Sequence, residues 1–183
     1  MARRLLFHQS MEPLRDLLAT DHRRALEFFV LGLTDVCEPT VDRQELLYNA
    51  SVLAHFAQVS AHAQGELPTP ASLTSVFDNF VLATGLPHGS LMLETAGAQC
   101  LLLTGFFERQ MRARHSVSWY ADLGAGFFER ASARESSPQK ARLLSAISKG
   151  FNGWRRRYGR LSRELSDQAY LLSPSNLGSR TRT

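Results

Sequence analysis

Apolar side chains recur along most of this chain at the three- and four-residue spacing of an amphipathic helix. No stretch alternates convincingly between apolar and polar residues, as a half-buried strand does. Proline and glycine cluster in 65–70 and 85–89, where the helical periodicity stops. The pattern therefore predicts an all-α single domain, a bundle of six or seven helices. The expected helices begin after Ser10 and then cover about 21–38, 40–63, 71–83, 90–107, 117–133 and 138–172.

The segment 91–107 differs from the other helical stretches because its apolar residues go almost all the way around. A helix that is apolar on every side belongs at the centre of a bundle. Gly97 and Gly105 lie eight residues apart on one face of this segment. Such small residues let a neighbouring backbone approach closely, although each glycine costs about 1 kcal/mol relative to alanine. The sequence predicts that the helix near 91–107 is the central one.

The most regular apolar pattern lies near the C-terminus. Seven large residues there are spaced alternately three and four positions apart, like the a and d positions of a heptad. This apolar seam consists of Leu144, Ile147, Phe151, Trp154, Tyr158, Leu161 and Leu165. An aromatic seam of this kind can pack within one chain or between two chains, so self-association is a further expectation.

The seam predicts that 139–172 is a basic amphipathic helix packed on a bundle core formed by 1–138. Ser137 can serve as its N-cap, with Pro138 at the first helical position. A break near Gly150–Gly153 is the main alternative, because glycine disfavours a helix interior. The remaining segment, 173–183, lacks apolar periodicity and is expected to be a mobile tail.

Charge is unevenly distributed along the chain. The 183 residues carry a net charge of +4, but 1–138 hold 15 acidic residues against 11 arginines. Residues 139–183 hold 10 basic residues and only Glu164 and Asp167 as acids. If 139–172 is one helix, five basic residues share the side opposite the seam and form a candidate surface for binding an anion or a partner: Arg142, Lys149, Arg156, Arg160 and Arg163. The alternative is that these side chains are only solvated.

These features favour a non-enzymatic helical interaction protein, an adaptor or regulatory subunit that acts by binding another protein. An acidic surface of a partner protein, or of a second copy, would complement the basic residues. A nucleic-acid-binding module that uses the same arginines is the alternative, since phosphates attract such a surface. Neither a zinc-finger spacing nor an aromatic RNA-binding motif accompanies them.

Signals for catalysis are weak. The sequence has no GxSxG or HExxH motif, and Cys37 and Cys100 lie far apart. An enzyme with a helical pocket around Glu94 is a third interpretation, in which Glu94 is buried beside His88, His115 or an arginine of 109–114. The favoured alternative places Glu94 in an exposed first turn, where a carboxylate interacts well with the helix dipole. We predict no catalytic residue, no metal site and no cofactor.

A membrane location is not expected. The most apolar window, 91–107, contains Glu94 and several other polar residues and is shorter than the roughly 20 residues of a spanning helix. Near the N-terminus, Glu12 and Asp16 precede any long apolar stretch, so no secretory signal is recognised there. The expected location is cytoplasmic.

Overall fold

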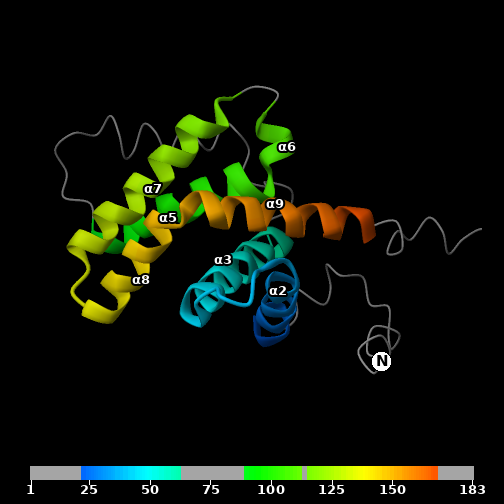
Figure 1. Cartoon of the computed structure of the whole chain (residues 1–183), viewed down its shortest axis with the longest axis horizontal. Coiled ribbons are helices and arrows are strands. Elements are labelled where there is room, and N and C mark those ends of the chain that lie inside the picture. The colour runs from blue at the N-terminus through cyan, green and yellow to red at the C-terminus, as the bar shows by residue number, and fades with distance from the viewer. Residues whose placement is uncertain (1–21, 63–88, 113–114, 169–183) are drawn as a thin grey trace, which may run out of the picture.

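The structure, a computed structural model, describes residues 22–62, 89–112 and 115–168, and all of its regular elements are helical, as predicted. They form one bundle of seven α-helices and a π-helical segment, η3 (Figure 1). The elements are α2 (His22–Val36), α3 (Arg43–His62), α5 (Ser90–Leu101), η3 (Leu102–Phe106), α6 (Glu108–Met111), α7 (Val117–Arg134), α8 (Pro138–Lys149) and α9 (Phe151–Gln168). The expected first helix, the expected helix at 71–83 and the expected tail at 173–183 lie outside the described residues.

The central position of the 91–107 segment is confirmed. Helix α5 packs on α7, and its continuation η3 packs on α9, so the segment contacts both later parts of the chain. Its inward residues Leu93, Ala96 and Leu101 have no exposed surface. The segment is not one regular α-helix, however, because five residues adopt π-helical turns before α6 begins. Apolar periodicity does not reveal these turns, because four consecutive residues, Leu102 to Gly105, are buried and the pattern has no exposed side whose shift could be seen.

Gly105 lies where η3 meets α9. A Cβ atom at this position would lie 2.8 Å from the Cβ of Tyr158 and 3.0 Å from the Arg155 carbonyl oxygen. The close approach of the α9 backbone therefore requires glycine here, as the sequence predicted for this face. At Gly97 the neighbour is different, because a Cβ there would meet the ring of Phe128 at 2.9 Å rather than a backbone.

The single helix expected over 139–172 is wrong. The chain forms α8 and α9, which are separated at Gly150, and it changes direction between them (Figure 1). Ser137 and Pro138 begin α8 as predicted, with the Ser137 hydroxyl accepting from the Lys140 amide. The heptad spacing continues unchanged across the break because both helices pack on the same core. The pattern therefore predicts which residues are buried, but it does not predict that they belong to one helix.

Helix α9 runs across the molecule, with α6 and α7 on one side and α2 and α3 on the other (Figure 1). Its Trp154 and Tyr158 are fully buried. The Trp154 indole donates to Glu45 Oε2 at 2.8 Å, and the Tyr158 hydroxyl donates to the Asn49 carbonyl oxygen at 3.0 Å. Of the seven seam residues, six are buried and Leu165 is partly buried against the core. The seam thus packs within its own chain.

Candidate binding surface

Burial of the seam turns the opposite side of α9 toward solvent. Arg156, Arg160 and Arg163 lie on that side, and all three are exposed. They are held outward because Trp154 and Tyr158 anchor the helix to α3 through the hydrogen bonds described above. The core therefore fixes the position of the helix that carries these three arginines, and Arg160 also donates to the Val36 carbonyl oxygen at 3.4 Å.

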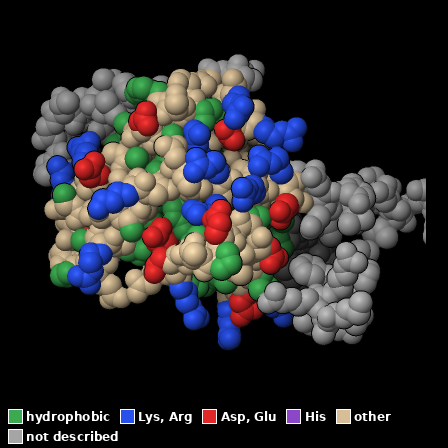
Figure 2. Space-filling view, viewed as in Figure 1, with side chains coloured by type: hydrophobic (Ala, Val, Ile, Leu, Met, Phe, Trp, Pro, Cys, Tyr) green, Lys and Arg blue, Asp and Glu red, His purple; other side chains and the backbone are tan. Residues whose placement is uncertain are grey.

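Helix α6 brings two further arginines to the same region. Arg109 and Arg112 are exposed, and Arg112 Nη2 donates to Glu108 Oε1 at 2.8 Å. A Cβ atom on Gly159 would lie 3.6 Å from both Glu108 Oε2 and Arg163 Nη1, so Glu108, the first residue of α6, reaches α9. Basic side chains gather over α6 and α9 in Figure 2, with acidic ones among them. We call the exposed set the arginine surface: Arg109, Arg112, Arg156, Arg160 and Arg163.

A glutamate from the turn between α2 and α3 meets the edge of this surface. Glu38 Oε2 accepts from Arg157 Nη2 at 2.8 Å and from Arg157 Nε at 3.2 Å. Arg160 Nη1 lies 3.9 Å from Glu38 Oε1. The hydrogen bonds from Arg157 hold the pKa of the Glu38 carboxyl below its ordinary value. Arg157 also stacks on the Trp154 ring at 4.9 Å, which ties this ion pair to the buried indole.

The remaining arginines of the surface are not engaged in this way. Within the described part of the chain, no ion pair joins Arg109, Arg156 or Arg163 to a carboxylate. Their guanidinium groups retain their donors for an external acceptor, and each can present two parallel N–H groups to a carboxylate or a phosphate.

The break at Gly150 changes the candidate surface drawn from the sequence. Arg142 and Lys149 are exposed as expected, but they lie on α8 and do not share a helix face with the arginines of α9. In their place the fold supplies Arg109 and Arg112. The sequence shows a polar, arginine-rich stretch at 109–114 but contains no signal that it approaches α9.

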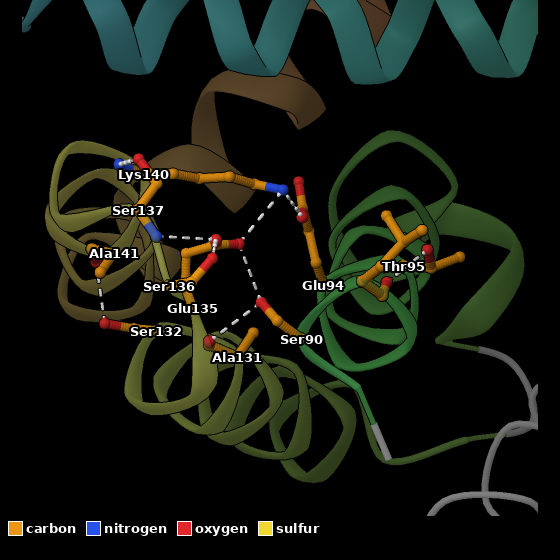
Figure 3. Close-up of polar contacts among 11 residues, drawn as sticks. Ser90, Glu94, Thr95, Ala131, Ser132, Glu135, Ser136, Ser137, Lys140 and Ala141 are labelled. Atoms are coloured by element: carbon orange, nitrogen blue, oxygen red, sulfur yellow. Dashed lines mark hydrogen bonds and ion pairs between the residues drawn. The ribbon is translucent and has the colours of Figure 1, made fainter.

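A second group of polar residues lies partly buried at the edge of the bundle, between α5 and the turn that joins α7 to α8 (Figure 3). Lys140 Nζ is 2.7 Å from Glu94 Oε2 and 3.4 Å from Glu135 Oε2. The Ser90 hydroxyl donates to Glu135 Oε2 at 3.1 Å. Hydrogen bonding to Glu94 raises the pKa of Lys140, and acceptance from the Ser137 amide lowers that of Glu135. These residues form a partly buried polar cluster: Ser90, Glu94, Glu135 and Lys140.

Glu94 is therefore not the exposed first-turn residue that the sequence favoured, since only 13% of its side chain is exposed. Of the partners expected for Glu94, His115 stacks against Tyr120 and Arg112 binds Glu108, while His88 and Arg114 lie outside the described residues. The carboxylate instead pairs with Lys140, 46 positions away in the chain.

Two further titratable groups lie near Glu94 in the core. Burial raises the pKa of the Tyr48 hydroxyl on α3 far above its ordinary value, and the negative charge of Glu94 raises it further. Burial also raises the pKa of the Cys100 thiol to about 12, so this sulfur is protonated at neutral pH and is a poor nucleophile. The arrangement fastens the α7–α8 turn to α5.

Within the described residues, no group of His, Cys, Asp and Glu side chains is placed to hold a metal ion. Among the same residues, no helix is both long and apolar enough to cross a membrane. Comparison with family models, with curated proteins and with solved structures gives no match to this chain.

Proposed function

We propose that this chain is a helical interaction module that binds an acidic surface of a partner protein through its arginine surface. The observation that carries the proposal is the arrangement of α9. This helix buries its apolar side in its own core and presents Arg156 and Arg163 to solvent without an internal ion pair among the described residues. Exposed arginines of this kind are enriched at protein interfaces.

Two features favour a protein partner over nucleic acid. The aromatic residues of α9, Phe151, Trp154 and Tyr158, are all buried and offer no platform on which a base could stack. In addition, Glu38 and Glu108 lie among the arginines and would repel a uniform row of phosphates. A protein surface can present groups of both signs and so can satisfy arginines and glutamates together.

The proposal is tested by affinity purification from an extract of the source cells, with and without nuclease treatment. We expect the wild-type chain to retain a protein partner in both arms. The triple variant R156Q/R160Q/R163Q should lose that partner, since each substitution removes a charge from the contact while leaving the core unchanged. The matched control is R24Q/R43Q/R130Q, which removes three exposed arginines from α2, α3 and α7.

The outcomes separate the alternatives. Retention of the partner by the triple variant would contradict the proposal. Recovery of nucleic acid, lost on nuclease treatment together with any protein, would favour the nucleic-acid-binding alternative instead. Equal loss in both triple variants would show a dependence on total charge and not on this surface.

A further inference from the structure

The two glutamates at the arginine surface occupy donors that an external anion would otherwise use. Glu108 accepts from both Nε and Nη2 of Arg112, at 3.3 and 2.8 Å. Glu38 accepts from two nitrogens of Arg157 and lies 3.9 Å from Arg160. Each carboxylate therefore takes the bidentate edge of one guanidinium, the edge that recognises phosphate best.

The positions of the two carboxylates give them an effect on any ligand that binds the arginine surface. Glu108 comes from α6 and reaches α9 at Gly159, where its Oε2 and Arg163 Nη1 each lie 3.6 Å from the position that a Cβ atom on this glycine would take. Glu38 comes from the α2–α3 turn and meets Arg157 and Arg160 of α9. The two glutamates thus approach α9 from separate elements, and any ligand that spans the arginine surface comes close to a negative charge.

A uniform polyanion cannot adapt to this arrangement. Two like charges about 4 Å apart repel by about 1 kcal/mol even in water. Duplex DNA carries a negative charge every 1.7 Å or so along its axis and has no positive group to set against a glutamate. A folded protein can place a lysine, an arginine or an amide opposite each carboxylate and acidic groups opposite the arginines.

Building on the proposed function, we propose that Glu38 and Glu108 are specificity determinants, which make the arginine surface select a partner protein of mixed charge and reject nucleic acid. They act by repulsion and by occupying arginine donors, while Arg156 and Arg163 supply attraction.

The test measures binding of a fluorescein-labelled DNA duplex of about 20 base pairs by fluorescence anisotropy over a range of salt concentrations. We expect E38Q/E108Q to bind this duplex more tightly than the wild type, by about fivefold for each carboxylate removed. The slope of log affinity against log salt should steepen by about 2, because Arg112 and Arg157 lose the carboxylates that occupy their donors and can then neutralise phosphates. The protein partner of the purification experiment should be retained less well.

The matched control is E27Q/E129Q, which makes the same change in net charge on α2 and α7, where Glu27 pairs with Arg23. The inference is overturned if E38Q/E108Q binds the duplex no more tightly than this control, or if the wild type already binds as tightly. The single variants E38Q and E108Q carry the same prediction should the double variant lose helical circular dichroism. Failure here leaves the proposed function standing, since that depends on the arginine variants and on a protein partner.

Discussion

Trp154 is the residue on which the position of α9 most depends. Its side chain is completely buried, its indole donates to Glu45, and Arg157 stacks on its ring. We expect Trp154→Ala to lower the free energy of unfolding by about 3–5 kcal/mol, through loss of buried surface and the cavity left behind. Urea unfolding followed by circular dichroism measures the change. Trp154→Phe, which keeps most of the volume, should cost clearly less; equal losses would mean that the indole hydrogen bond dominates.

Lys140 is expected to matter for stability because it is the cationic partner of a largely buried carboxylate. Lys140→Met removes the charge that lies 2.7 Å from Glu94 and leaves that carboxylate unpaired. The free energy of unfolding should fall by about 1–3 kcal/mol. Adding Glu94→Gln to this variant should recover part of the loss, because an uncharged amide is less costly to bury without a cation. A double-mutant cycle with no coupling between the two positions would contradict the pairing.

Acid should destabilise the fold through Glu38 and Glu135, because the pKa of each is lowered in the native state. A carboxylate with a lowered pKa contributes stability above its ordinary value of 4.5, and this contribution disappears as the pH falls through the native value. Unfolding free energies measured from neutral pH down to about pH 3 should therefore decline below 4.5. In Glu135→Gln the decline should be shallower. An unchanged profile would mean that Glu135 is not stabilised as its contacts indicate.

For single residues, the sequence predicts which side chains are buried but not which side chains pair with one another. The seam residues, including Trp154, could be placed inside from spacing alone, because a helix exposes or buries residues by their angle. Glu94 was singled out for its apolar surroundings, but its partner Lys140 comes from another helix. Pairing across helices depends on how the helices dock, and one sequence does not encode that in any local pattern.

At the scale of elements, the contact between η3 and α9 gives different surroundings to two glycines that have the same neighbours in the sequence. Gly105 and Gly126 both begin the string Gly-Phe-Phe-Glu-Arg. A Cβ on Gly105 would collide with α9, whereas one on Gly126 would have nothing within 4 Å. We expect Gly105→Ala to destabilise the fold by about 1–3 kcal/mol. Gly126→Ala should stabilise it by up to about 1 kcal/mol, since alanine favours the helix. Thermal unfolding of the two variants decides the matter, and similar midpoints would contradict the close contact.

The apolar periodicity predicts that the fold is all-helical and that the 91–107 segment is central. It does not predict where one helix ends and the next begins. Gly150 and Gly153 gave reason to consider a break, and the chain does break at Gly150. The heptad spacing alone favoured one continuous helix. Two successive helices that bury their apolar sides in the same core can show the same spacing as a single helix. The π-helical turns at 102–106 were not predicted, because the residues there are apolar on every side, and in the structure they lie where Gly105 meets α9.

At the scale of the whole molecule, charged residues from distant segments of the chain come together to form the arginine surface. The sequence places the basic residues near the C-terminus, and the fold adds two arginines and a glutamate from α6 and another glutamate from the α2–α3 turn. Burial of the aromatic seam removes it as a means of joining two copies. Self-association therefore stays a prediction that rests on charge alone, and light scattering at low salt tests it.

Hydrogen–deuterium exchange of the chain with its purified partner tests the arginine surface most directly, because it locates the contact without any substitution. We expect slower exchange in peptides that cover 108–112 and 155–164 when the partner is added. Peptides from α7 and α8, including those around Arg142, should exchange at the same rate as in the free chain. Protection confined to α7 or α8, with α6 and α9 unchanged, would contradict the account.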